Sequence, residues 1–444
     1  MAYDFTTAAN SVEEFWMPFT PQRLFKKAPR MVVRASGMHY YDENNKPILD
    51  AAAGMWCVNA GHDQPKVKEA INAQLELLDF APAFQFGHPT VFKAASRVIA
   101  GMPKDYTHVF FSNSGSEAVD TALKIALAYQ RMKGQGTRRV LIGRERAYHG
   151  VNFGGISVGG LPYNRAVFGQ LLPNIDHLPH THDLTRNAFA KGQPEHGIDF
   201  ADALERLVYL HDASNIAAVI VEPVSGSTGV LPPPKGYLKR IREICDKYGI
   251  LMIMDEVITG FGRFGAMSSA DYFGVTPDII TMAKGLTNGT VPMGATVVKK
   301  EIYDAFMNGP EQFIELMHGY TYSGHPLAAA AVIGTLDTIS DQKIFENAKK
   351  MEKPFEDALH SLKDAPRVVD IRNCGILGGI QIQEHPDKDD PGRWCREAAY
   401  ELFRQGVMVR YTGPNICVSP PLICNDNHMD EIVTKIGSVL KGLK

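Results

Sequence analysis

Short apolar runs alternate with helical patterns between about residues 60 and 300. Six of these runs are apolar almost throughout and lack strict alternation, as strands buried on both faces require. They are His108–Ser112, Arg139–Ile142, Ala217–Val224, Leu251–Val257, Asp278–Ala283 and Ala295–Val298. Helical patterns such as Ala118–Arg131 and Leu238–Tyr248 lie between some of them. This alternation predicts an α/β domain built around a largely parallel sheet.

The pattern differs toward both ends of the chain. Near the start, residues 31–34 and 38–41 flank Ala35-Ser36-Gly37 and predict a small hairpin. Later in the chain two helical stretches precede three short apolar segments, and these are Ala328–Ile339, Ile344–Leu362, Val368–Ile371, Gly379–Ile382 and Gly406–Val409. We therefore expect a large domain over 61–329 and a smaller α+β domain over 330–444, to which the N-terminal segment 1–60 contributes.

Composition and charge narrow the class of protein. A length of 444 residues favours two domains. The net charge of −3, with acids and bases interspersed, gives no basic footprint for nucleic acid or an anionic membrane. No apolar stretch approaches the roughly 20 residues that cross a bilayer, and the first residues do not resemble a signal peptide. Six scattered cysteines form no Cys-x-x-Cys pair, so we expect a cytoplasmic protein with reduced thiols.

Polar residues stand where several predicted strands end. Glu222 follows Ala217–Val221, Asp255 follows Leu251–Met254, and Lys284 follows Ile279–Ala283. Ligands of open α/β sheets bind at these carboxyl ends. An ionised group at the end of a buried run needs a partner or a ligand, so an acid and a lysine after successive strands indicate a site.

The first predicted strand of this domain opens into small residues. Ser114, Gly115 and Ser116 precede a helix that we expect to begin at Glu117. Exposed backbone N–H groups at a helix N-terminus suit a phosphate, although an ordinary N-cap explains the same residues. A lysine, an aspartate and a phosphate-binding helix terminus are the parts that pyridoxal 5'-phosphate (PLP) needs. In that reading Lys284 forms a Schiff base with the cofactor and Asp255 keeps its pyridine nitrogen protonated.

Together these motifs resemble a known family. The segments SNSGSEAVDTALKIA, YHG, VEPV, DEVITGFGR, MAKGL and GYTYSGHPLA are similar, in this order, to the class III PLP-dependent aminotransferases of fold type I. The similarity extends from Trp56 to Pro421. Within the family, the stretches NRAVFGQLLPNIDHLPHTHD, PPKGYL and AKGLTNGTVPMGA are most like the ω-amino acid:pyruvate, or β-alanine:pyruvate, transaminases.

The resemblance implies the residues that hold the cofactor. Lys284 would be the imine lysine and, once displaced, the base that moves a proton to and from the substrate carbon. Asp255 would pair with the pyridine nitrogen, Tyr148 would stack on the ring, and Thr321 would reach the phosphate of a partner subunit. The remaining cofactor-binding residues implied are Ser114, Gly115, Ser116, His149, Glu222, Val257 and Ile258.

The resemblance also implies a substrate pocket that two subunits share. Arg410 would clamp the carboxylate of pyruvate or alanine in a bidentate manner and swing aside for other donors. Aromatic walls would come from Trp56 and Phe84, with Phe19 and Tyr320 from the partner chain, although each could equally lie in the core. We therefore expect a homodimer, or a tetramer built from it.

Four other motifs suggest different chemistry. The G-x-G-x-x-G at Gly260–Gly265 lacks the strand-to-helix turn of a dinucleotide site. Met252–Glu256 resembles the acidic strand of a P-loop ATPase, but the chain has no Gly-Lys dipeptide. Gly155–Gly159 matches a nucleophile elbow without its strand–turn–helix context. The histidines of residues 177–182 lie in a Pro-flanked stretch without a second ligand cluster, so we expect no metal site.

The sequence thus predicts an aminotransferase that moves an amino group from an ω-amino acid or primary amine to a keto acid, pyruvate. Rival reactions within the class are transamination with 2-oxoglutarate, decarboxylation-dependent transamination and an aminomutase reaction. A non-catalytic PLP-binding protein is the rival from a different class. The presence of Lys284, Asp255 and the phosphate loop argues against that last reading.

Overall fold

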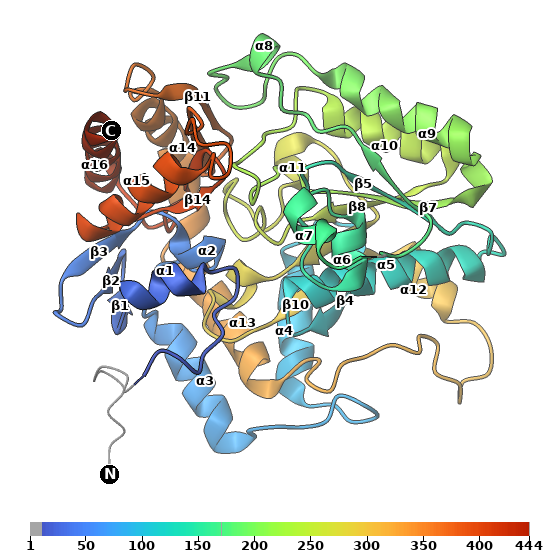
Figure 1. Cartoon of the computed structure of the whole chain (residues 1–444). Helices are drawn as coiled ribbons and strands as arrows, with labels where there is room; N and C mark the ends of the chain where they lie inside the picture. The colour runs from blue at the N-terminus through green and yellow to red at the C-terminus, as the bar shows by residue number, and fades with distance from the viewer. Residues whose placement is uncertain (1–10, 170, 444) are drawn as a thin grey trace.

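A computed structural model of the protein describes residues 11–169 and 171–443. A seven-stranded sheet, in the order β4-β10-β9-β8-β7-β5-β6, forms its centre (Figure 1). The strands are β4 (Tyr106–Ser112), β5 (Val140–Arg144), β6 (Ile175–Leu178), β7 (Ile216–Val221), β8 (Leu251–Asp255), β9 (Ile279–Met282) and β10 (Gly294–Lys299). Strands β6, β5, β7, β8 and β9 run parallel, and β10 is antiparallel to both β9 and β4. The predicted α/β fold with a mostly parallel sheet is confirmed.

Helices cover both faces of this sheet because successive residues of its strands point to opposite sides. In β7, Ala218 and Ile220 pack toward α5 (Gly115–Met132) and α12 (Lys300–Phe306). The alternate residues of β7, Val219 and Val221, pack toward α9 (Ala203–His211) and α10 (Tyr237–Tyr248). Figure 1 shows the two helix pairs on opposite sides of the strands. Burial on both faces explains why these strands lack a polar alternation in the sequence.

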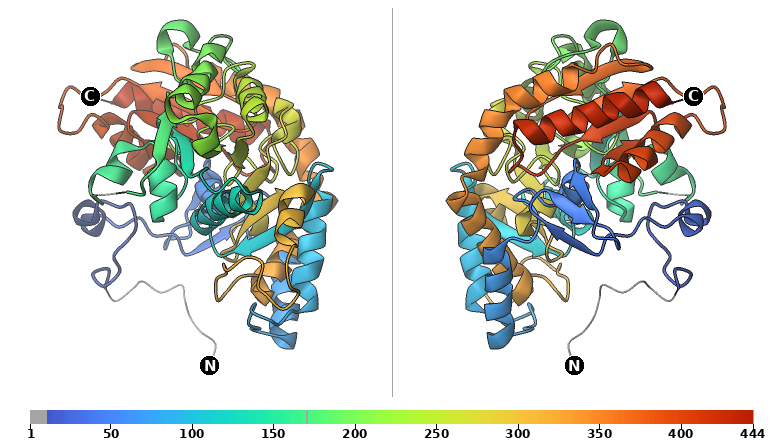
Figure 2. Two further views of the ribbon diagram at one scale, coloured as in Figure 1. Left: turned by 90° about the vertical axis from the view of Figure 1, so that its right-hand side faces the viewer. Right: turned by 90° about the vertical axis from the view of Figure 1, so that its left-hand side faces the viewer.

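The N-terminal strands lie beside the C-terminal part of the chain (Figure 2). Strands β1 (Arg34–Ser36), β2 (His39–Tyr41) and β3 (Pro47–Asp50) form a sheet whose fourth member is β13 (Val407–Met408), parallel to β3. A separate antiparallel sheet has the order β11-β12-β15-β14, with bounds Val368–Asn373, Gly378–Ile382, Asn415–Val418 and Arg410–Thr412. This pairing of distant segments favours the expected grouping of the N-terminal segment with the C-terminal domain, and the domain bounds stay a prediction.

The remaining helices surround these sheets. Their bounds are α1 (Gln22–Lys27), α2 (Ala53–Trp56), α3 (Pro65–Leu77), α4 (Pro89–Ala100), α6 (Phe153–Val158), α7 (Pro162–Ala166), α8 (Leu184–Asn187), α11 (Ala270–Phe273), α13 (Pro326–Asp341), α14 (Ile344–His360), α15 (Arg393–Arg404) and α16 (Asp426–Gly442), with 3₁₀ turns at Ile198–Asp202, Ala213–Asn215 and Lys284–Thr287. Among the described residues, no helix has both the length and the apolar character to cross a bilayer.

Several boundaries differ from the sequence prediction, and two of them have a clear local reason. Helix α5 begins at Gly115, two residues before the expected start, because the Ser114 hydroxyl accepts a hydrogen bond from the Glu117 N–H at 3.2 Å and caps the helix. Strand β7 ends at Val221 rather than Val224. Pro223 lies two residues later, and proline has no N–H to donate to the hydrogen bonds of a central strand.

Candidate active site

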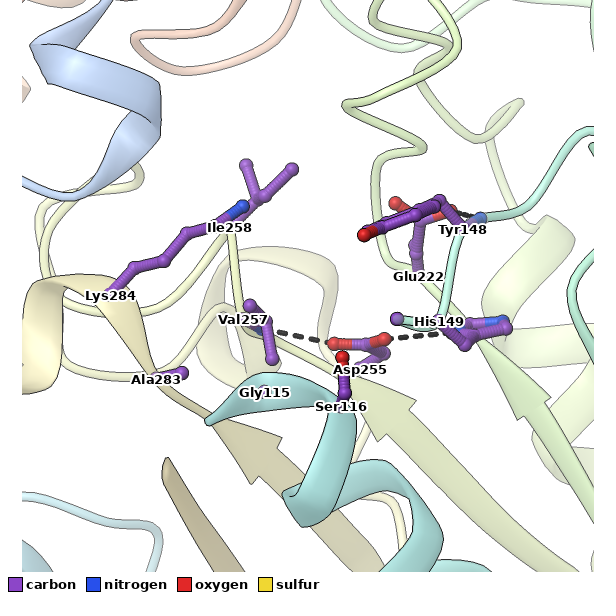
Figure 3. A pocket seen from close by; sticks show the side chains of 11 residues that line it. Gly115, Ser116, Tyr148, His149, Glu222, Asp255, Val257, Ile258, Ala283 and Lys284 are labelled. Carbon is purple, nitrogen blue, oxygen red and sulfur yellow. Dashed lines mark hydrogen bonds and ion pairs between the residues drawn. The ribbon is translucent and has the colours of Figure 1, made fainter. Parts of the chain in front are cut away.

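A pocket opens where the carboxyl ends of β5, β7, β8 and β9 meet the start of α5 (Figure 3). The cavity has a volume of about 130 Å³. The lining residues are Gly115, Ser116, Tyr148, His149, Gly150, Glu222, Asp255, Val257, Ile258, Ala283 and Lys284. The structure thus brings together the residues implied to bind the cofactor, apart from Ser114 and Thr321.

Lys284 enters the pocket from a turn that follows β9. Its backbone is left-handed, with φ of 49°, and it starts the 3₁₀ turn Lys284–Thr287. Burial lowers the pKa of Lys284, while the nearby Cys57, Asp255 and Glu222 oppose that shift. A lysine with a lowered pKa holds more of its amine in the neutral, nucleophilic form at neutral pH.

Asp255 ends β8 and is fixed from three directions. Oδ1 accepts hydrogen bonds from the Val257 N–H at 3.1 Å and the Thr281 hydroxyl at 3.2 Å. Oδ2 lies 2.7 Å from Nδ1 of His149 (Figure 3). The carboxyl is only 5% exposed, and Nε2 of His149 is buried without a hydrogen-bond partner among the described residues. Such a buried, anchored acid can pair with a cationic ring nitrogen that enters the pocket.

Glu222 follows β7 and holds the loop that carries Tyr148. Its Oε1 accepts a hydrogen bond from the Tyr148 N–H at 3.0 Å, and its Oε2 accepts one from the Gly226 N–H at 3.2 Å. Burial raises the pKa of Glu222, although neighbouring His149 acts in the opposite direction. Glu222 therefore positions the aromatic side of the pocket.

The start of α5, which lines the pocket, suits a phosphate. Gly115 and Ser116 begin the 18-residue helix α5, whose first N–H groups and dipole favour an anion. A Cβ on Gly115 would lie 3.0 Å from a methyl of Val257, and one on Gly150, which has φ of 91°, would lie 2.4 Å from the Ser116 hydroxyl. A side chain at either position would therefore crowd other residues of the pocket lining. Ser114 contributes as the helix cap rather than as a lining residue.

Two of the implied substrate residues lie near Lys284. Trp56 is buried, and its ring lies 5.0 Å from Nζ of Lys284. Arg410 is half-buried in β14, and its Nε has no hydrogen-bond partner among the described residues. Burial lowers the pKa of Lys284 and raises the pKa of Tyr148. In both cases the positive charge of Arg410 acts to lower the pKa, which is the effect of a cation close to the pocket.

The other implied residues lie away from the pocket of their own chain. Phe19 is 70% exposed and Phe84 55% exposed. The Phe84 ring lies beside Gly319, since a Cβ there would approach it to 2.8 Å. Tyr320 donates a hydrogen bond to the backbone carbonyl of residue 117 at 3.3 Å, and Thr321 is exposed. None of these four residues lines the pocket of its own chain.

Sequence reasoning overlooked three residues of the site. Gly150 and Ala283 line the pocket, and Thr281 binds Asp255. Thr281 carried a recognisable sign, because it is the single polar residue in the apolar strand Ile279–Met282. The close approach of Gly150 to Ser116 joins segments far apart in the chain and leaves no local sequence pattern.

The residues present fit PLP. The pocket offers an amine at Lys284, an anchored carboxylate at Asp255 for the pyridine nitrogen, and a helix N-terminus for the phosphate. Tyr148 on one side and Val257 with Ile258 on the other point into the same space (Figure 3). These are the groups by which a protein orients this cofactor and tunes its electronics.

Comparisons with known proteins agree with this chemistry. The family model for class-III aminotransferases matches residues 23–440, and the chain belongs to that family. It is a PLP-dependent aminotransferase. It is 57% identical to an omega-aminotransferase of Caulobacter vibrioides, over 97% of this chain and 98% of that protein. It is 47% identical to a beta-alanine–pyruvate aminotransferase of Pseudomonas aeruginosa, over 96% and 95%.

A solved structure extends the comparison to three dimensions. The PLP-bound amine transaminase from an uncultivated Pseudomonas species superposes with a TM-score of 0.89 at 36% identity, covering 98% of this chain and all of that one. The fold type I architecture and the cofactor expected from the sequence are therefore confirmed.

The lowered pKa of Lys284 predicts how this residue affects the stability of the cofactor-free protein. Since its pKa is lower in the folded state than the ordinary 10.5, the unfolded chain binds the proton more tightly. The cost to folding is complete below the folded-state pKa and disappears as the pH rises above about 10.5. Lys284→Met should therefore stabilise the cofactor-free protein most at neutral pH, with a gain that shrinks toward alkaline pH.

Denaturant unfolding across this pH range measures the effect. Lys104→Met, which changes an exposed lysine, should alter stability by the same small amount at every pH. A Lys284→Met gain that is constant with pH, or that grows as the pH rises, would contradict the lowered pKa.

Proposed function

We propose that this aminotransferase transfers an amino group from an ω-amino acid or a primary amine, such as β-alanine, to pyruvate. The products are an aldehyde or keto compound and alanine. The observation that carries the proposal is Arg410, a guanidinium close enough to influence Lys284 and Tyr148, whose buried Nε has no partner within residues 11–169 and 171–443. Arginine binds a carboxylate in a bidentate manner, which a small keto acid requires. The similarity to a beta-alanine–pyruvate aminotransferase supports the same substrate class.

The chain's own groups have separable roles in the reaction. When bound, PLP withdraws electrons from the substrate carbon and stores the amino group between the two half-reactions. The Lys284 amine takes a proton from the donor carbon that carries the nitrogen, and returns one to the keto carbon of pyruvate in the second half-reaction. Asp255 compensates the positive charge of the pyridine nitrogen. Arg410 orients the carboxylate of the acceptor, and Tyr148 covers one side of the pocket.

A two-stage absorbance experiment tests this function. The purified holoenzyme should lose its cofactor absorbance when β-alanine is added and recover it when pyruvate follows. Bleaching that 2-oxoglutarate reverses and pyruvate does not would overturn the acceptor assignment. Release of carbon dioxide would favour a decarboxylating reaction, and the absence of a response to any amine would indicate a protein that only binds the cofactor.

The same experiment with Arg410→Lys tests the carboxylate clamp. Lysine keeps the charge but loses the bidentate fork, so kcat/KM for pyruvate should fall about 100-fold. Bleaching by benzylamine, which has no carboxylate, should change little and serves as the internal control. An equal loss for both compounds would assign Arg410 a general structural role instead.

We further propose that the protein is a homodimer in which each subunit completes the other's pocket. Large exposed hydrophobic side chains support this, since extensive exposed apolar surface marks contact sites. They include Phe15, Trp16, Phe86, Phe313 and Met317, between 64% and 87% exposed. Thr321 and Tyr320, with Phe19, would then reach the partner's cofactor and substrate. Light scattering should give at least twice the chain mass of 48.9 kDa, and an active monomer would contradict the proposal.

A further inference from the structure

The turn that carries Trp56 has an unusual backbone. Ala53, Gly54 and Trp56 have φ values of 46°, 70° and 59°, and the short helix α2 is kinked within these residues. For Ala53 and Trp56 this left-handed region is sparsely populated, because a Cβ crowds the following carbonyl. Such a conformation persists only where surrounding contacts impose it.

Asp50 supplies those contacts. It ends β3, its side chain is completely buried, and Oδ1 accepts a hydrogen bond from the Ala52 N–H at 3.0 Å. Oδ2 accepts one from the Gly54 N–H at 2.7 Å and lies 2.8 Å from Nε2 of His62. A charged acceptor forms stronger hydrogen bonds than a neutral one. The carboxylate thus ties together two N–H groups of the strained turn.

Tyr40 packs beside the turn, next to Gly54 and His62. The Tyr40 ring packs against the His62 ring, with centroids 4.2 Å apart. A Cβ on Gly54 would lie 3.0 Å from the Tyr40 hydroxyl, so the turn has little room to move in that direction. Buried Asp50 and His62, with half-buried Tyr40, therefore form a polar support for residues 52–56.

Residues 59–61, which follow this turn closely in the chain, contact the Lys284 turn and the residue after it. Asn288, which follows that turn, donates to the Gly61 carbonyl and accepts from the Ala60 N–H, both at 2.8 Å. Asn59 donates to the Phe261 carbonyl at 2.8 Å, and a Cβ on Gly285 would lie 2.6 Å from its amide nitrogen. The Trp56 ring and the Lys284 amine are consequently held in a fixed relation, 5.0 Å apart.

We propose that Asp50 is a positioning residue that sets the size of the amine the site accepts, by holding Trp56 in place. Trp56 packs with Ile258, which lines the pocket, so its ring limits the space next to Lys284. Releasing the turn lets the ring move and admits bulkier donors. The inference rests on the proposed amine transamination.

The test compares a small donor with a bulky one. In Asp50→Asn one oxygen becomes an amide that cannot accept a hydrogen bond, so one turn N–H loses its acceptor. The ratio of kcat/KM for benzylamine to that for β-alanine, with pyruvate as acceptor, should rise about tenfold, as in Trp56→Ala. Hydrogen exchange should show lost protection of the Ala52 or the Gly54 amide in the Asp50 variant, a local change independent of activity.

Two further variants keep the test decisive. Asp278→Asn also alters a buried carboxylate, one that accepts from the Met252 N–H at 2.7 Å and binds Arg242 and Lys299 at the opposite end of β9. It should lower stability without changing the donor ratio. Gly54→Ala strains the same turn from the Tyr40 side and should reproduce the change of ratio if Asp50→Asn does not fold.

The outcomes separate this inference from the proposed function. Failure of the wild type to transaminate either amine with pyruvate would refute the proposed function itself. Suppose that the donor ratio shifts in Trp56→Ala but stays at the wild-type value in Asp50→Asn and Gly54→Ala. That result would overturn the proposed role of Asp50 and leave the proposed function standing. An equal shift in Asp278→Asn would overturn it as well, because general loosening would then explain the effect.

Discussion

The parallel register of β8 and β9 is the constraint on which the site depends. It places Asp255 opposite Thr281, so the carboxylate at the end of one strand and the lysine just after the next share one edge of the sheet. Burying either group alone costs free energy, because a buried carboxylate and a buried ammonium each lose hydration. Their proximity, with the hydrogen bonds to Asp255, offsets part of that loss. A slip of one residue would turn every side chain of β9 to the other face.

Around this pair the fold supplies rigid supports rather than additional reacting groups. Glu222 fixes the Tyr148 loop through a backbone N–H, and His149 holds Asp255 from the side opposite Thr281. On the amine side, Asn288 and Asn59 connect the Lys284 turn to the segment that bears Trp56. Groups held by packing and hydrogen bonds need little reorganisation during the reaction. This accounts for the buried polar contacts around the pocket.

The sequence predicted the site best where a reactive or ligand-binding residue stands at the end of a recognisable strand or at the start of a helix. Buried runs ending at Asp255 and before Lys284, and small residues ahead of α5, were sufficient to predict the fold class and the cofactor. The sequence could not predict what depends on contacts between distant segments. An example is the pairing of Asn288 with Ala60 and Gly61, because these hydrogen bonds join segments 228 and 227 positions apart. The edge strand β6 is short, with an aspartate and a histidine among its four residues, and its pattern was too weak to identify.

The proposed chemistry requires that Lys284 bind PLP covalently. Borohydride reduction of the holoenzyme, followed by proteolysis and mass mapping, tests it most directly. The reduced cofactor should be attached to the peptide that contains Lys284 and to no other lysine. Attachment at a different lysine, or cofactor that remains fully dissociable after reduction, would contradict it.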